Sequence, residues 1–344
     1  AGRGGVLHRH DRPPGAVPAQ LPPDVGDFTG RAAELELIVH ALADAGRPGP
    51  AVVVVSGGLG AGKTTLAVRA ARTVRAAFAD GQLYAELNGS AGGPGEPAAV
   101  LAGFLRALGV PAEEIPERTA ERAERYRALL AGRRVLVVLD GARDEEQVRR
   151  LLPGDPSSAV LVTARGRLGG LAASPAVHLG RLTPEESVAF LSAVAGRSRI
   201  AAEPAAAADI AAACGRLPLA LRVAATKLAA RPTWTVAAVA DRLRDERRRL
   251  AELRVGELAV EAELRGSHRL LPEDLAAALP RLAALPVGSV PEAAVALGVP
   301  EPAAGLILER LAEAGMLDSP EQGRYAFHDL VRLFALLAAP GGTD

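Results

Sequence analysis

The chain has 344 residues, of which 49% are hydrophobic, and this length predicts two or three domains rather than one. Its 40 basic and 40 acidic residues balance, so direct nucleic-acid binding by charge alone is not expected of this chain. A single cysteine, Cys214, excludes an intrachain disulfide framework and a cysteine zinc site. The chain has no signal-peptide pattern and no apolar run of membrane-spanning length, which predicts a soluble, cytoplasmic protein without membrane partners.

The N-terminal half alternates apolar strands with helices. Residues 1–24 are rich in proline and predict a linker or disordered arm, and a short amphipathic helix is expected over residues 31–45. Beyond them the pattern predicts strands at 51–56, 82–87, 133–140, 158–165 and 176–180, and helices at 63–78, 98–109, 119–132 and 144–152. Because continuous apolar strands separated by helices need cover on both faces, residues 25–181 are predicted to form an α/β domain around a parallel sheet.

The C-terminal half is predicted to be mainly helical. Residues 182–255 carry only helical patterns and predict an all-helical domain. The next segment, 256–340, predicts helices near 258–270, 272–284, 289–298 and 301–315, then two short strands around a polar turn and a last helix. This order resembles a winged-helix domain, and residues 341–344 form a tail.

A glycine-rich loop follows the first strand. The stretch GGLGAGKT, from Gly57 to Thr64, matches the phosphate-loop pattern of nucleoside triphosphatases, with a strand before it and a helix after it. Its glycines let backbone N–H groups face phosphates, and the helix N-terminus adds positive potential. Lys63, one of only two lysines in the chain, is expected to reach the β- and γ-phosphates, and Thr64 to hold Mg²⁺. The first domain is therefore predicted to be a P-loop NTPase domain.

Two later strands end in residues suited to the same site. Asp140 ends the strand RRVLVVLD, where open sheets place ligand groups, and is expected to hold Mg²⁺ through water. Many hydrolysing relatives carry a second acidic residue directly after this aspartate, but here Gly141 follows, so rapid hydrolysis is not expected. Arg165, after the next strand, is suited to contact a γ-phosphate, although a solvated loop arginine explains it equally well.

Two further residues point to no ligand by themselves. Pro218, in GRLPLAL, suits the first turn of a helix, so a purely structural role is the default. His328 lies where a strand turns into a helix, with Asp329 as an ordinary N-cap, and a core or surface histidine would explain it.

Six motifs in a fixed order carry more information than any one of them. They are FTGR (28–31), GGLGAGKTTLA (57–67), VLVVLDGA (135–142), LVTAR (161–165), GRLPLAL (215–221) and FHDL (327–330). This series resembles the NB-ARC module of the STAND class of signalling ATPases over about residues 18–340. Its nearest likeness is to AfsR-like transcriptional regulators of the Streptomyces antibiotic regulatory protein type, to which the lead-in PAQLPPDVGDFTGR is similar.

The resemblance implies a role for each motif. Phe28 and Arg31 would lie near the base and the ribose or phosphates, Arg165 would sense the γ-phosphate, Pro218 would pack on adenine, and His328 would contact the β-phosphate of ADP. Asp140, with Thr64, would serve Mg²⁺. The residues that would wrap the phosphates are Gly57, Gly58, Leu59, Gly60, Ala61, Gly62, Lys63, Thr64 and Thr65. One departure is Phe327, which stands where many relatives have methionine before the histidine.

The function that the resemblance implies is an ATP/ADP-operated switch in a bacterial transcriptional regulator of antibiotic biosynthesis. ADP would hold a closed monomer, and ATP would open it and permit self-association, with slow ATP hydrolysis. A DNA-binding region and a repeat sensor in flanking segments of the same protein would be its partners. Two alternatives stay open: an active ATPase or phosphotransferase using the same loop, and direct DNA binding by the winged helix.

Overall fold

The computed structural model describes residues 17–44, 49–87, 95–171, 175–285 and 288–338. Its central element is a five-stranded sheet in which all neighbouring strands are parallel, in the order β2-β3-β4-β1-β5. The predicted parallel sheet is therefore confirmed, with strands β1 (Ala51–Gly57), β2 (Gly81–Glu86), β3 (Val135–Ala142), β4 (Ala159–Ala164) and β5 (Ala176–Leu179).

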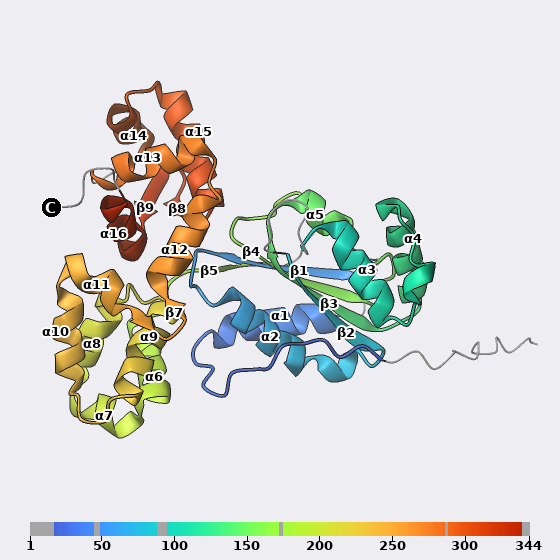
Figure 1. The fold of residues 1–344 in the computed structure, drawn as a ribbon, viewed down its shortest axis with the longest axis horizontal. Coiled ribbons are helices and arrows are strands. Elements are labelled where there is room, and N and C mark those ends of the chain that lie inside the picture. The colour runs from blue at the N-terminus through green and yellow to red at the C-terminus, as the bar shows by residue number, and fades with distance from the viewer. Residues whose placement is uncertain (1–16, 45–48, 88–94, 172–174, 286–287, 339–344) are drawn as a thin grey trace, which may run out of the picture.

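Helices cover both faces of this sheet (Figure 1). Alternate side chains of β1 enter separate cores: Val53 and Val55 pack with α1 and α2, whereas Val52 and Val54 belong to the core of the opposite face. This alternation explains the continuous apolar runs, because each strand is buried on both sides. The covering helices are α1 (Ala32–Ala43) and α2 (Lys63–Thr73) on one face, and α3 (Pro97–Ala107), α4 (Thr119–Leu130) and α5 (Glu145–Arg149) on the other.

Residues 17–24 do not form a free arm, which corrects the prediction for this part of the segment. Ala19 forms a parallel bridge with Gln82 at the outer edge of β2, and Gln82 N–H donates to the Pro18 carbonyl at 2.7 Å. Further along, Arg72 of α2 donates to the Pro22 carbonyl, and Arg69 pairs with Asp24 at 3.1 Å. We call residues 18–25 the strap. Residues 1–16 lie outside the described part of the chain.

The segment 182–255 is largely helical, as expected. Its first helix begins with a capping box, in which Thr183 and Glu186 satisfy each other's backbone N–H groups. Two features were not predicted: a break in the helical pattern at Asp245, and a hairpin of two-residue strands, β6 (Arg254–Val255) and β7 (Leu258–Ala259). The helices are α6 (Pro184–Ala195), α7 (Arg197–Ala202), α8 (Pro204–Ala213), α9 (Pro218–Ala229), α10 (Val236–Arg244) and α11 (Glu246–Glu252).

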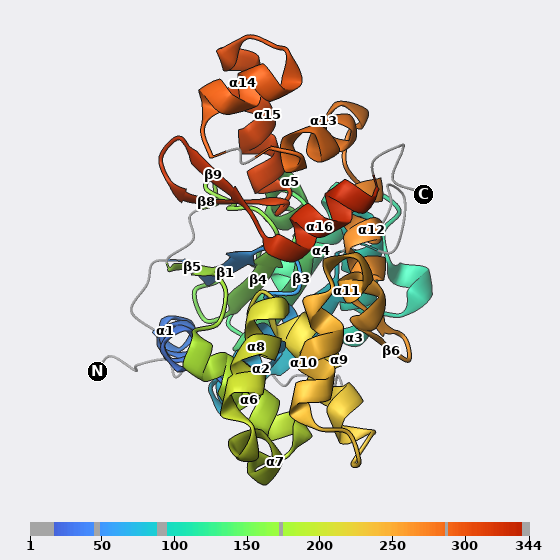
Figure 2. The ribbon, with the colours of Figure 1, turned by 90° about the vertical axis from the view of Figure 1, so that its left-hand side faces the viewer.

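The last segment contains helices around one antiparallel hairpin, β8 (Leu317–Glu321) and β9 (Arg324–Phe327). Figure 2 places the C-terminal helix α16 next to the hairpin and above α11. One continuous apolar core joins this segment to the helices before it. The other helices are α12 (Val260–Arg269), α13 (Glu273–Ala283), α14 (Val290–Leu297) and α15 (Glu301–Glu313). None of the helices among the described residues is long and apolar enough to cross a membrane.

Candidate functional site

The phosphate-loop pattern adopts the geometry that the sequence predicts. The loop leaves β1 at Gly57, and α2 begins at Lys63 with Gly62 as its N-cap. Gly62 has φ 88°, a left-handed conformation that glycine adopts without steric cost. The loop therefore presents the N-terminus of an eleven-residue helix toward the space beyond the carboxyl end of β1.

Lys63 lies folded over the loop. Its Nζ donates to the carbonyls of Gly57 and Gly58, each at 2.8 Å. Burial and the nearby charge of Arg165 lower the pKa of Lys63 to about 8, although Asp140 opposes this shift. Burial also lowers the pKa of Arg165, so two cations converge here in a poorly solvated place. An anion bound between them would relieve this cost.

The Asp140 carboxylate is buried and receives hydroxyl groups from three other elements. Thr64 donates to it at 2.8 Å, Thr163 of β4 at 2.6 Å, and Tyr84 of β2 at 3.2 Å. Thr163 also accepts the Gly141 N–H at 2.8 Å, which fixes the chain after the aspartate. The predicted pair of Thr64 and Asp140 is thus brought together at the end of the sheet.

This oxygen-rich cluster suits a particular kind of metal binding. No group of three or more histidine, cysteine or carboxylate side chains that could hold a metal is present among the described residues. Mg²⁺ does not need such a cage, since it keeps several waters and takes one or two protein oxygens together with phosphate oxygens. The hydroxyl of Thr64 and the carboxylate of Asp140 fit that requirement.

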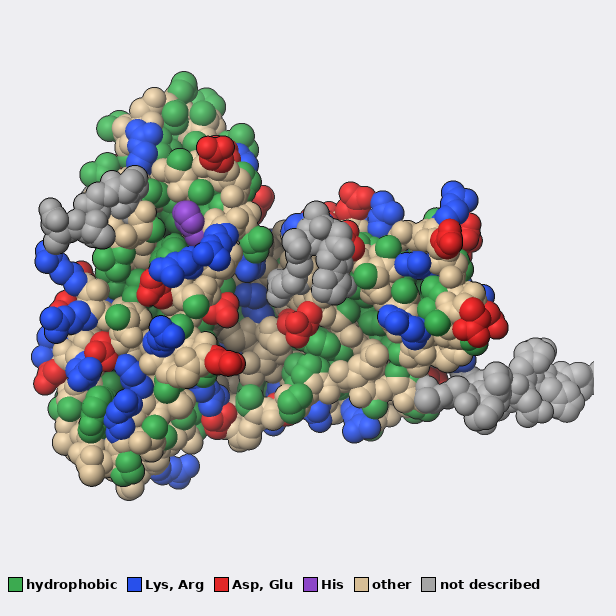
Figure 3. Space-filling view, viewed as in Figure 1, with side chains coloured by type: hydrophobic (Ala, Val, Ile, Leu, Met, Phe, Trp, Pro, Cys, Tyr) green, Lys and Arg blue, Asp and Glu red, His purple; other side chains and the backbone are tan. Residues whose placement is uncertain are grey.

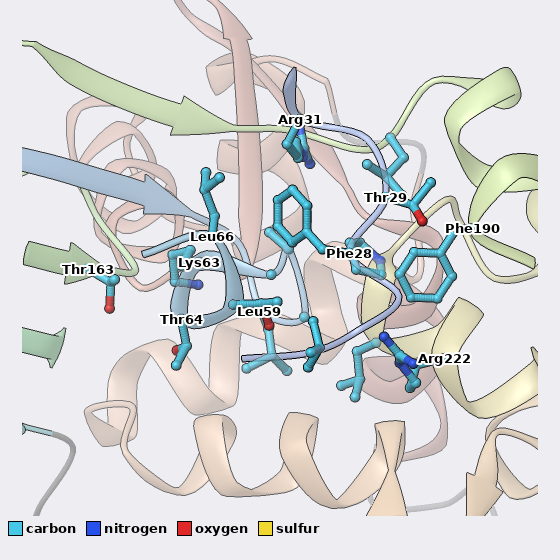
Figure 4. A pocket seen from close by; sticks show the side chains of 18 of the residues that line it. Phe28, Thr29, Arg31, Leu59, Lys63, Thr64, Leu66, Thr163, Phe190 and Arg222 are labelled. Atoms are coloured by element: carbon cyan, nitrogen blue, oxygen red, sulfur yellow. The ribbon is translucent and has the colours of Figure 1, made fainter. Parts of the chain in front are cut away.

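A cavity of about 340 Å³ opens over the loop. Figure 4 shows its two ends: Thr64 and Thr163 lie at one, Phe190 and Arg222 at the other, and Phe28 lies between them. The first end has hydroxyl groups and Lys63, and at the second end the Arg222 guanidinium, which pairs with Asp27, lies over the Phe190 ring. The predicted site residues among its lining are Phe28, Arg31, Leu59, Gly60, Ala61, Gly62, Lys63, Thr64, Thr65, Arg165 and Pro218.

Phe28 and Arg31 are held by contacts from other parts of the chain. The guanidinium of Arg69 lies over the Phe28 ring, 4.9 Å from its centroid. Arg31 is 7% exposed, and its backbone N–H donates to Glu186 of α6 at 2.9 Å. Its side chain donates to Glu34 at 3.0 Å and to the Gly180 carbonyl, whereas its buried Nε has no hydrogen-bond partner in the described part of the chain. These contacts fix the lead-in motif against the cavity.

The start of α9 closes the cavity from the helical segment. Pro218 occupies its first turn, as the sequence suggests, and its ring is 3.6 Å from where a Cβ on Gly62 would be. The next residue, Leu219, donates its N–H to the Gly60 carbonyl at 3.2 Å. The GRLPLAL motif therefore touches the phosphate loop directly.

His328 lies beside the loop but does not line the large cavity. It is 7% exposed and borders a smaller cavity that also touches Gly58, Leu59 and Ala61. Leu330 N–H donates to Nδ1 at 3.2 Å, so Nε2 carries the proton and donates to the Gly215 carbonyl at 3.0 Å. Burial, with the nearby charge of Arg181, lowers the pKa of His328, and its ring is neutral near pH 7.

Gly215 is a partner that sequence reasoning missed. It has φ 59°, and a Cβ there would lie 2.3 Å from Cε1 of His328. The GRLPLAL motif begins with this glycine, because a side chain would displace the histidine. The contact joins the helical segment to the C-terminal segment.

Other residues of the site had no signal in the sequence. Arg222 of α9 forms a two-pronged ion pair with Asp27 and lies over the Phe190 ring, 4.9 Å from its centroid. The resulting hydrogen bond lowers the pKa of Asp27. Arg181 forms an ion pair with the C-terminal segment, its Nη1 lying 3.7 Å from Oδ2 of Asp329. Contacts between residues so distant in the sequence cannot be predicted from local patterns, because they form only when the segments fold against each other.

The acidic residues after Gly141 do not enter the cavity. Asp144 caps α5 by accepting the Gln147 N–H at 2.8 Å. Glu145 pairs with Arg149, and Glu146 pairs with Arg150. Each is therefore engaged on its own side of the fold, away from the phosphate loop.

Comparisons with known proteins identify the family of the phosphate-loop domain. The NB-ARC domain family matches residues 31–201. The regulatory protein AfsR of Streptomyces coelicolor is 49% identical over 330 residues, and that of Streptomyces griseus is 46% identical over 325 residues. Each alignment covers 94% of this chain but 33% of the relative, so the chain spans about a third of the length of these proteins.

A solved structure supports the fold alone. A Walker-type ATPase of Pyrococcus abyssi aligns with a TM-score of 0.59 at 14% identity, covering 91% of this chain and 97% of that protein. Together with the phosphate loop and the parallel sheet, these findings confirm the resemblance that the six motifs carry. Residues 31–201 of the chain are an NB-ARC domain with a P-loop NTPase fold, and the chain is similar along nearly its whole length to the AfsR regulatory proteins.

Proposed function

We propose that this chain is a nucleotide-operated switch, closed by ADP and opened by ATP. The observation that carries the proposal is the meeting of three segments at one phosphate loop. Leu219 of the helical segment bonds to Gly60, and Gly315 of the C-terminal segment lies against Gly58, with its carbonyl 3.8 Å from the position of a Cβ there. A ligand at this loop would therefore bear on all three segments at once.

In this proposal the segments are three domains. Residues 25–181 form the nucleotide-binding domain, 182–255 the all-helical domain and 256–340 a winged-helix domain that acts as a clamp rather than a reader of DNA. The polar end of the cavity takes the phosphates, which Lys63 contacts, and Thr64 and Asp140 would hold Mg²⁺. Adenine lies against Phe28 and Pro218, toward the end of the cavity that Phe190 lines.

His328 acts as a latch in this switch. Its imidazole bonds to Gly215 and borders a small cavity that Gly58 also lines, so it ties the C-terminal segment to the helical segment next to the phosphate loop. ADP would favour this arrangement, and ATP would favour an open one that self-associates. A ligand shifts such a balance only through its different affinities for the two states.

Hydrolysis is proposed to be slow. Gly141 follows Asp140, and the acidic residues beyond it are engaged in α5. Next to Asp140 the described cavity is lined by Gly141 and Thr163. Neither has a carboxylate that could activate water. Slow turnover suits a switch, because the ATP state must last long enough to signal.

The output is proposed to be regulation of transcription, including genes of antibiotic biosynthesis, in the cytoplasm. The AfsR proteins to which this chain is similar are about three times longer than the aligned region. A DNA-binding region and a repeat sensor in flanking segments would supply the output and the input. The switch between them would set when the protein self-associates.

Calorimetric titration with ADP and ATP, each with Mg²⁺, tests the proposal. We expect both nucleotides to bind with one site per chain and guanine nucleotides to bind far more weakly. Lys63→Ala should abolish binding, whereas Lys227→Ala, at the other lysine of the chain, should preserve it. Size-exclusion chromatography with light scattering should detect larger species with a non-hydrolysable ATP analogue and monomers with ADP. Equal behaviour with both nucleotides would contradict the switch.

A further inference from the structure

The cavity has an unequal distribution of charge. Its described lining contains four cationic side chains but one acidic residue, Glu263, and the cations are Arg31, Lys63, Arg165 and Arg222. Three of the cations have polar partners: Arg31 and Arg222 pair with carboxylates, and Lys63 bonds to loop carbonyls. The guanidinium of Arg165 makes no hydrogen bond or ion pair with the described residues. It is the cation still available to a ligand.

Glu263 reaches this cavity from the C-terminal segment. It lies in the first turn of α12, and the cleft in Figure 3 separates the half of the molecule that carries α12 from the half that carries the sheet. Burial lowers the pKa of Arg165, and the negative charge of Glu263 opposes that lowering. The two side chains form no direct ion pair, and Glu263 is exposed at the mouth of the cavity. Its influence on Arg165 therefore acts across the space between the segments.

We propose that Glu263 makes the switch respond to the third phosphate of the nucleotide, because it opposes a γ-phosphate in the closed arrangement. This inference rests on the proposed nucleotide switch. The γ-phosphate of ATP would approach the cavity end formed by Lys63 and Arg165. There its negative charge would be attracted to Arg165, as the Glu263 carboxylate is, and the two negative groups would repel each other.

ADP lacks this conflict, since its two phosphates are held by the loop. The closed arrangement would thus bind ADP more tightly than ATP. Movement of α12 away from the cavity would remove the repulsion between Glu263 and the γ-phosphate. Like charges separated by a few ångströms of partly solvated space interact by an amount that changes an equilibrium several-fold. This gives the C-terminal segment a physical reason to distinguish the two nucleotides.

The matched test uses two glutamates of the same helix. Glu263→Gln removes the charge in the cavity while keeping the shape of the side chain. Glu261→Gln is the control, because Glu261 lies on α12 but pairs with Arg265 and does not line the cavity. Affinities for ADP and for a non-hydrolysable ATP analogue would be measured by calorimetry on each variant.

We expect Glu263→Gln to tighten binding of the ATP analogue roughly three- to tenfold, with ADP changed less than about twofold. The control should leave the ratio of the two affinities unchanged. The shift should shrink as salt is raised from low to high concentration, which a change in packing would not produce. Light scattering should also detect less ATP-dependent opening and self-association in Glu263→Gln.

The outcomes separate the two claims. A wild-type chain that binds neither nucleotide overturns the proposed function and this inference with it. A wild-type chain that binds both, with an affinity ratio that Glu263→Gln leaves unchanged, overturns the inference alone. A shift in ratio equal to that of Glu261→Gln would also overturn it, because the effect would then belong to the helix and not to the cavity. Unchanged thermal unfolding would establish that the variant folds.

Discussion

Binding of a nucleotide should depend on pH through Lys63. Its ammonium group is buried in the free chain beside Arg165, and these surroundings lower its pKa to about 8 from the ordinary value of 10.5. A phosphate group placed against it would stabilise the charged form and raise the pKa again. Nucleotide binding above pH 8 must therefore be coupled to uptake of a proton by Lys63.

The direction and size of the effect follow from the lowered pKa. Near pH 7.5 most of the free protein already carries the proton on Lys63, so binding costs nothing extra. At pH 9, about one unit above the free-state pKa, roughly one molecule in ten carries it. ADP affinity should therefore fall about tenfold from pH 7.5 to pH 9, a range in which the phosphates of ADP are already ionised.

Calorimetry in two buffers with different ionisation enthalpies measures both quantities. The difference in binding heat between the buffers counts the protons taken up, and nearly one should be taken up at pH 9. Lys227→Arg is the control, because Lys227 pairs with Glu252 away from the cavity and its replacement should leave the pH profile intact. An ADP affinity that stays constant from pH 7.5 to pH 9, with no proton uptake, would refute the reasoning.

Three further predictions concern the contacts around the cavity. Gly215→Ala should destabilise the chain by about 1–3 kcal/mol in urea denaturation, because the new Cβ collides with His328. Gly266→Ala should not, because a Cβ there meets no described atom within 4 Å beyond its own stretch of helix. Tyr84→Phe should weaken the dependence of nucleotide affinity on Mg²⁺ a few-fold by removing a donor to Asp140; Tyr126→Phe, whose hydroxyl has no hydrogen-bond partner among the described residues, is the control. Asp27→Asn should cost up to about 1 kcal/mol at pH 7, and the difference should vanish as pH falls below 3.8, because Arg222 lowers the folded-state pKa of Asp27.

The parts of the fold that the sequence predicts well are those with local causes. Each strand of the sheet is an apolar run between polar ends, so the predicted strand at 158–165 and the observed β4 (Ala159–Ala164) differ by one residue at each end. The phosphate loop is equally local, since the glycines, the lysine and the helix start lie within nine residues of each other. The break at Asp245 was missed because the helical pattern continues through it, although Asp245 is extended and its carboxylate caps α11 by accepting the Arg247 N–H at 3.0 Å.

The parts that could not be predicted depend on how distant segments meet. Arg222 and Asp27 are 195 residues apart, and Arg31 and Glu186 are 155 apart. No periodicity or spacing joins such pairs, and the many arginines of this chain hide the few that matter. The composition of residues 1–24 predicts a linker or disordered arm for a related reason. The backbone carbonyls of the strap accept hydrogen bonds from arginines of α2 and from the Gln82 N–H. Any residue type has such a carbonyl, so these bonds cannot be predicted from the composition of the strap.

Identifying the nucleotide that this protein carries tests the central claim most directly. The purified chain would be denatured, and the released nucleotide identified and counted by chromatography against the protein concentration. We predict one equivalent of ADP per chain in the wild type and none in Lys63→Ala. A wild-type chain that releases no nucleotide and then binds neither added ADP nor added ATP would contradict the claim that its phosphate loop operates a switch.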